Sequence, residues 1–173
     1  MRYTLVLLMA TVVLAGADTA GGIKWNPPAG WKAQGQRPMR AATYTVPAAP
    51  GDKEPGECAV YYFGPNEGGG VDANIKRWIG QFEQPDGSPS AKKAQIHKQT
   101  ANGLSVTTID VSGTYTGAGG PMAPTRISKP GYRLLGAIVG GPQGAVFFKF
   151  TGPARTVAGA QTAFQGMLKS LSR

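Results

Sequence analysis

The side chains that could perform acid, base or nucleophilic chemistry are few in this sequence and lie far apart. His97 is the only histidine and Cys58 the only cysteine among 173 residues. A serine hydrolase would have to combine His97 with Asp110 and with a serine that no motif identifies, because the chain has neither a G-x-S-x-G nor an H-E-x-x-H sequence. We therefore expect His97 to be an exposed, non-catalytic side chain on a polar strand.

Paired carboxylic acids are a second possibility, since glycoside hydrolysis needs only two of them at a suitable separation. Most acidic residues fall in predicted loops or on polar helix faces, where a solvated carboxylate is the ordinary state. Asp110 differs because it lies within an apolar strand, and a buried carboxylate needs a partner. The acids considered are Glu54, Glu57, Glu67, Asp72, Glu83 and Asp110.

The lone cysteine excludes an internal disulfide and a cysteine-rich zinc site. Cys58 is followed by the strand-like sequence Ala-Val-Tyr-Tyr-Phe. Since free cysteine is among the most buried residue types, we expect Cys58 to be buried and inert, with an intermolecular bridge as the alternative. The sequence predicts no metal and no cofactor.

Basic residues outnumber acidic ones by 18 to 9, so the chain should attract anionic partners. Three glycines before a predicted helix could cradle an anion with their backbone N–H groups, although a flexible connection is the simpler interpretation. Clustered lysines could likewise form a contact surface or be merely solvated. The candidate anion or partner contacts are Gly69, Gly70, Lys76, Arg77, Lys92, Lys93 and Lys98.

The first residues resemble an export signal. Arg2 provides a positive start, residues 4–14 form an apolar run, and Ala15-Gly16-Ala17 supplies the small residues of a cleavage site. A lipoprotein would carry cysteine where Ala17 stands. The sequence thus predicts a signal peptide over 1–17 and a single domain over 18–173, soluble in the periplasm or secreted, with a net charge of 17 − 9 = +8. No later segment is long and apolar enough to span a membrane.

Short runs of β-branched and aromatic residues between Gly and Pro clusters predict a sheet. Asn102-Gly103 between two such runs is a strong hairpin signal. The last two runs carry apolar residues on both faces, which places them in the middle of a covered sheet. The predicted strands are 31–35, 39–46, 57–63, 92–100, 104–115, 132–139 and 145–151, with a long loop over 117–131.

Two segments change to helical periodicity. Over 71–84 the apolar residues follow i, i+4, i+7, i+8 spacing, and Pro85 should end the helix. A second helix should begin with Pro153 in its first turn and continue to 171. The fold class is therefore α/β of the α+β type: a mostly antiparallel central sheet of about six or seven strands with two main helices packed on it.

Two motifs and the order of elements resemble the PsbP-like fold, named after the extrinsic subunit of photosystem II. The motifs are Trp25-Asn-Pro-Pro-Ala-Gly-Trp31 at the start and Phe147-Phe-Lys-Phe-Thr-Gly-Pro153 before the final helix. The middle, Tyr61-Tyr-Phe-Gly64 with Gly69 and the helix residues up to Phe82, resembles a set of uncharacterised exported bacterial proteins. The resemblance implies a docking or accessory role without catalysis, and it supplies no site residues.

These observations predict an exported, non-catalytic binding or accessory protein of the cell envelope. Its partner would be an envelope protein or an anionic surface, while export and the lack of nucleic-acid modules argue against nucleic acid. A small-molecule or lipid carrier is the alternative, because aromatic strands and long loops could wall a pocket. A hydrolase with dispersed carboxylates is the second alternative.

Overall fold

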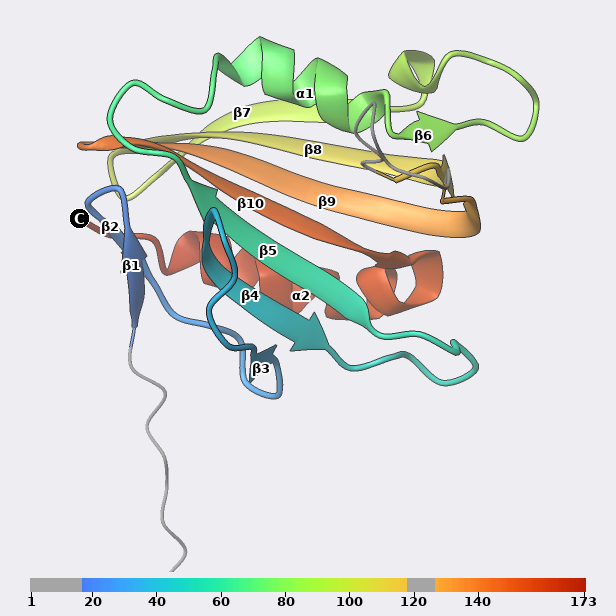
Figure 1. The fold of residues 1–173 in the computed structure, drawn as a ribbon, viewed down its shortest axis with the longest axis horizontal. Helices are drawn as coiled ribbons and strands as arrows, with labels where there is room; N and C mark the ends of the chain where they lie inside the picture. The colour runs from blue at the N-terminus through green and yellow to red at the C-terminus, as the bar shows by residue number, and fades with distance from the viewer. Residues whose placement is uncertain (1–16, 118–126) are drawn as a thin grey trace, which may run out of the picture.

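The computed structural model describes residues 17–117 and 127–173, which form an eight-stranded antiparallel sheet with two α-helices (Figure 1). This confirms the predicted α+β class. A separate two-stranded hairpin consists of β1 (Asp18–Ala20) and β2 (Ile23–Trp25). In spatial order the sheet contains β3 (Lys32–Ala33), β4 (Arg40–Val46), β5 (Gly56–Tyr62), β10 (Gly144–Pro153), β9 (Lys129–Gly141) and β8 (Leu104–Tyr115), with β6 (Phe82–Glu83) and β7 (Gln95–Ala101) both paired to β8.

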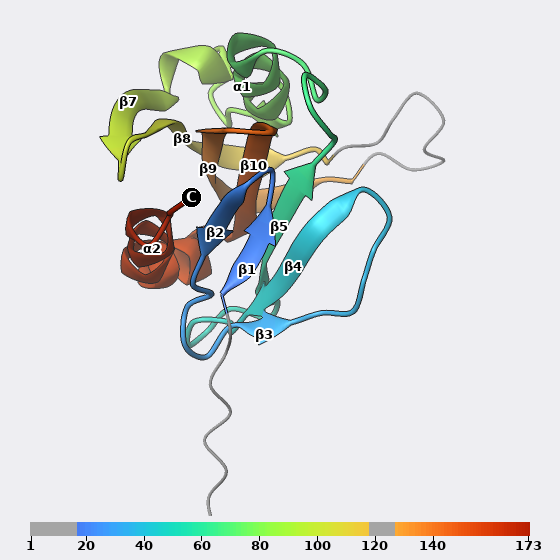
Figure 2. The ribbon, with the colours of Figure 1, turned by 90° about the vertical axis from the view of Figure 1, so that its left-hand side faces the viewer.

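The two helices lie on opposite faces of this sheet. Helix α1 (Val71–Ile79) covers one face, and α2 (Ala154–Lys169) covers the other, as Figures 1 and 2 show. Because successive side chains of a strand point to opposite faces, β8, β9 and β10 contribute to both layers. The α2 layer contains Leu135, Phe148 and Phe164, and the α1 layer contains Ile109 and Trp78.

Close packing of α1 depends on a glycine. A Cβ built on Gly136 would lie 2.5 Å from a ring carbon of Trp78 and 2.8 Å from a side-chain carbon of Ile109. Only a residue without a side chain lets the Trp78 ring rest directly on β9. The apolar stripe predicted for this helix is thus buried against the sheet.

The predicted hairpins are confirmed. Asn102 and Gly103 have φ angles of 49° and 78°, the left-handed conformations that a two-residue type I′ turn requires. Strands β9 and β10 form the second hairpin and lie in the middle of the sheet order. Burial of Cys58 is also confirmed, since its exposed fraction is 0%.

Several predicted boundaries are wrong. The first helix ends at Ile79 and not at residue 84, because Gly80 terminates it and Phe82 pairs with Tyr115 in the sheet. This added strand β6 raises the count from the expected six or seven to eight. Pro153 is the last residue of β10 and precedes α2 instead of standing in its first turn.

Two predicted segments lie wholly or partly outside the described residues: the signal peptide over 1–17, of which 1–16 are not described, and the loop over 117–131, of which 118–126 are not described. Within the described ranges, no helix has the length and apolar character needed to cross a membrane.

Candidate functional site

A groove opens where α2 leaves part of the sheet uncovered. Helix α2 buries Phe164, Met167 and Leu168 in the layer it forms with β9 and β10. Strands β7 and β8 continue past the helix, and Figure 2 shows β7 and α2 on the same side of the molecule. Two adjoining clefts of about 660 and 640 Å³ lie there and share Gln95 and Asp110. We call these two clefts together the α2 groove.

Strand alternation explains why one wall of the α2 groove is polar. Gln95, His97 and Gln99 occupy every second position of β7 and therefore share a face. Gln95 lies opposite Asp110 of β8, and His97 lies opposite Thr108. The apolar α2 layer reaches β7 only at its last residue, Ala101, so Gln95, His97 and Gln99 are exposed.

The opposite wall comes from α2. Gln161 and Gln165 are four residues apart, so they lie on the same helix face, and both line the groove. The side-chain amides of Gln95, Gln99 and Gln165 form no hydrogen bond to another part of the described chain. The groove thus presents unpaired amide donors and acceptors from both walls.

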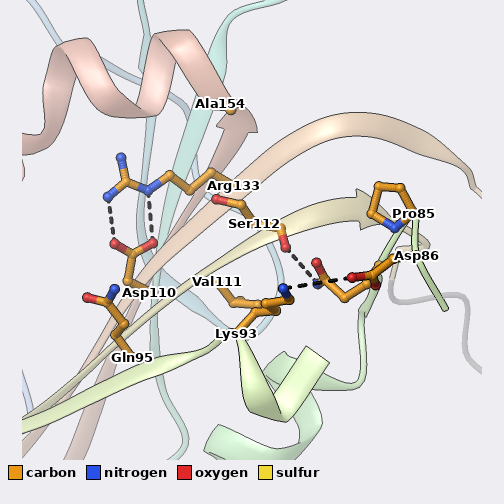
Figure 3. A pocket seen from close by; sticks show the side chains of 10 residues that line it. Pro85, Asp86, Lys93, Gln95, Asp110, Val111, Ser112, Arg133 and Ala154 are labelled. Carbon is orange, nitrogen blue, oxygen red and sulfur yellow. Dashed lines mark hydrogen bonds and ion pairs between the residues drawn. The ribbon is translucent and has the colours of Figure 1, made fainter. Parts of the chain in front are cut away.

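Asp110 and Arg133 form a two-pronged ion pair at the junction of the two clefts (Figure 3). The distances are 2.8 Å from Arg133 Nε to Asp110 Oδ1 and 2.6 Å from Nη2 to Oδ2, and Nη2 also donates to Gln161 Oε1 at 2.9 Å. The predicted need of Asp110 for a partner is confirmed. Hydrogen bonding to Asp110 raises the pKa of the Arg133 guanidinium, which therefore stays charged at any physiological pH.

The two ends of the α2 groove are built differently. At one end Gln84 Nε2 donates to the Ser112 carbonyl at 2.8 Å. Lys93 Nζ lies 3.8 Å from Asp86 Oδ2 at the same end (Figure 3). At the other end Asn102 Nδ2 donates to the carbonyls of Lys169 and Leu171 at 3.2 and 2.7 Å. The β7–β8 turn is thereby tied to the end of α2, which fixes the width of the groove.

His97 lines the same cleft as Asp110. Among the described residues that line this cleft there is neither a serine nor a cysteine, and Asp110 is engaged by Arg133. His97 is exposed, as predicted. Within residues 17–117 and 127–173, no three histidine, cysteine or acidic side chains gather as a metal site would require.

The predicted basic contacts do not form one surface. Lys93 lines the α2 groove. Lys76 and Arg77 are exposed on α1. Lys98 is exposed on the face of β7 that points away from the groove. It shares this face with Ile96, which pairs with the α1-layer residue Ile109. Lys92, at the end of a short 3₁₀-helix (Ser90–Lys92), is exposed as well.

The glycine segment before α1 is held by a side chain. Asn74 Nδ2 donates to the carbonyls of Gly68 and Gly70 at 2.8 and 3.0 Å, and Arg77 donates to Asn74 Oδ1 at 3.2 Å. Gly69 has a φ of 78°, which favours glycine. These contacts explain the segment structurally, and its role as an anion cradle stays a prediction.

A buried lysine that sequence reasoning missed lies on the α1 face of β10. Lys149 is 9% exposed, and its Nζ donates to Gln81 Oε1 at 2.6 Å and to the Tyr115 hydroxyl at 3.4 Å. Burial, with a smaller contribution from Arg40, lowers the pKa of Lys149 to about 8, although Glu57 partly opposes this change. The phenylalanines on both sides of it, at 147, 148 and 150, were the sequence signal that could have indicated burial of Lys149.

The amides of the α2 groove were not predicted either. Position 99 belongs to a polar strand, whereas 161 and 165 belong to a helix more than 60 residues later, and nothing in the sequence states that they face each other. One feature of the sequence could have indicated this wall of the groove. Positions 95, 97 and 99, every second residue of a predicted strand, are all polar, so that face of the strand has no apolar side chains to pack under another layer.

The chain is thus an α+β domain with a polar groove on one face of its sheet. No family model matches the chain, and no curated protein sequence matches it. A solved structure from Pseudomonas aeruginosa, the protein of unknown function PA94, described as a putative regulator, is 11% identical. It aligns over 91% of this chain and 96% of its own length with a TM-score of 0.46. That similarity is too low to support an argument about function.

Proposed function

We propose that the protein is an exported, non-catalytic binding protein of the cell envelope that holds its ligand in the α2 groove. The observation that carries the proposal is the set of unpaired amides on both walls, Gln95 and Gln99 facing Gln165. Such polar groups fix the orientation of a ligand, and the largely buried Phe164 and Leu168 form the floor below them.

Export is the second part of the proposal, and the position of β1 supports it. Strand β1 begins at Asp18, the residue directly after the predicted cleavage site, and the Asp18 carboxylate accepts a hydrogen bond from Tyr44. Removal of residues 1–17 would therefore leave every described strand intact. Membership of the PsbP-like group, with its docking and accessory roles, belongs to the same proposal.

The polar lining favours binding of a polar ligand over lipid transport. A lipid carrier needs a deep apolar cavity, whereas the α2 groove exposes amides, His97 and the Asp110–Arg133 pair. The exposed Lys76, Arg77 and Lys98 are proposed as an additional contact with an anionic surface on the α1 face.

Expression of the full chain in a bacterial host with two membranes tests both parts. We expect the protein in the periplasmic or secreted fraction, with Asp18 as its first residue by N-terminal sequencing. A photo-reactive amino acid at Gln99 should yield a crosslinked product in intact cells, and the same amino acid at Thr162, exposed on α2 outside the groove, should not. Equal crosslinking from the two positions would refute the groove as the binding site.

A further inference from the structure

The α2 groove has the length of an extended polymer. Strand β7 borders it over seven residues, from Gln95 to Ala101. At a rise of roughly 3.3 Å per residue, this wall is about 20 Å long. A ligand that contacts both Lys93 at one end and Asn102 at the other must be elongated.

One wall of the groove is also a sheet edge. Strand β7 pairs with β8 on one side, and no other strand of the described chain pairs with it. An edge strand presents a row of unpaired N–H and C=O groups, to which an extended peptide can add as a further strand. The sheet curves so that β7 and α2 lie on the same side (Figure 2), and an added strand would lie between them.

The opposite wall offers side chains that match a peptide backbone. The amides of Gln161 and Gln165 on α2 each carry a donor and an acceptor, as a peptide group does. Gln165 has no hydrogen-bond partner within the described residues. An extended peptide would therefore find backbone partners on β7 and amide partners on α2.

Sugars are a weaker match to this lining. Saccharide rings usually stack on exposed Trp, Tyr or Phe rings, and the side chain of this kind that lines the groove, Phe164, is only 3% exposed. Charge adds a preference among peptides. Lys169 forms no ion pair within the described residues, and Asp110, the carboxylate that lines the same cleft, is already paired with Arg133. The free positive charge favours an acidic side chain.

We propose that the α2 groove binds an extended acidic polypeptide segment of about seven residues, which adds as a strand to the free edge of β7 and contacts Gln165 and Lys169 of α2. This inference rests on the proposed function, because it names the ligand class of the same groove.

The test uses the full chain expressed in the bacterial host described above, purified as the host processes it and labelled with ¹⁵N for NMR. The probes are pools of acetylated and amidated heptapeptides with Glu, Ser or Lys fixed at the centre. We expect the Glu pool to bind most tightly and to shift the backbone amides of β7 and the side-chain amide of Gln165. N-methylation of alternate peptide amides should weaken binding at least tenfold, because each lost hydrogen bond costs about fivefold.

Variants and a second probe separate the possible outcomes. Gln165→Ala should weaken peptide binding about fivefold, and Thr162→Ala, a matched change on the same helix outside the groove, should leave it unchanged. If a hexamer of N-acetylglucosamine shifts the groove resonances and no peptide pool does, the peptide inference is wrong while the binding groove stands. Binding that tolerates N-methylation, or no response to any peptide pool, also overturns it. Failure of the crosslinking experiment would instead remove the proposed function.

Discussion

The ion pair between Asp110 and Arg133 should contribute measurably to folding, unlike the ion pairs at the protein surface. Its two side chains are 29% and 17% exposed, and two charge-assisted hydrogen bonds join them. Loss of one partner leaves the other charge partly desolvated inside the groove. Hydrogen bonds to charged groups contribute about 1.5–3 kcal/mol, so Asp110→Ala and Arg133→Met should each lower the free energy of unfolding by about 2–3 kcal/mol.

The stability of the double variant, Asp110→Ala with Arg133→Met, shows how strongly the two charges interact. When both charges are absent no unpaired charge remains, so the two losses should not add, and we expect a coupling free energy of about 1–3 kcal/mol. Urea unfolding of the parent, both single variants and the double variant measures this quantity, with equal urea dependence as the condition for comparing them.

A matched cycle on an exposed pair serves as the control. Arg37 and Glu57 are 3.4 Å apart with side chains 48% and 41% exposed. Arg37→Met and Glu57→Ala should show a coupling below about 1 kcal/mol, since water already solvates both groups. A coupling at Asp110–Arg133 no larger than that of the exposed pair would refute the view that burial in the groove strengthens the interaction.

Three further changes probe the packing around the sheet. The pKa of Lys149 in the folded protein is lowered to about 8, so the unfolded chain binds more protons between about pH 8 and 10.5. The free energy of unfolding of the parent, measured in urea, should therefore rise with pH over this range relative to that of Lys149→Met. Gly136→Ala should cost about 1–3 kcal/mol and alter the fluorescence of Trp78, because the added methyl collides with its ring. Tyr44→Phe should cost about 1–3 kcal/mol in thermal unfolding, since the buried Trp25 Nε1–H then loses the acceptor that lies 2.8 Å away.

Each of these changes has an outcome that would contradict it. Parallel pH profiles for Lys149→Met and the parent would show that the buried amine titrates normally. Gly159→Ala on α2 is the control for Gly136→Ala, because a Cβ at Gly159 meets nothing within 4 Å. It should raise the free energy of unfolding by about 0.5–1 kcal/mol. A Gly136→Ala variant that also raised the free energy of unfolding would contradict the proposed collision with Trp78. Unchanged melting of Tyr44→Phe would mean that Trp25 finds another acceptor.

The sequence was sufficient for features that depend on local chemistry. The turn at Asn102-Gly103, the seven main strands and the two helical stripes follow from residue type and from periods of 2 and 3.6, which neighbouring residues set by themselves. The need of Asp110 for a partner likewise followed from its apolar flanks. Boundaries failed where a distant residue competes with the local pattern, as when Phe82 leaves the helical pattern to pair with Tyr115.

Only the tertiary structure decided what the polar residues do. Arg133 is 23 residues from Asp110, and Gln165 is 66 residues from Gln99, so no local rule joins them. The groove exists because α2 packs over β9 and β10 and stops short of β7, and side-chain packing between distant segments sets that offset. The same packing buries Lys149, whose sequence neighbours reveal its strand but not the layer above it.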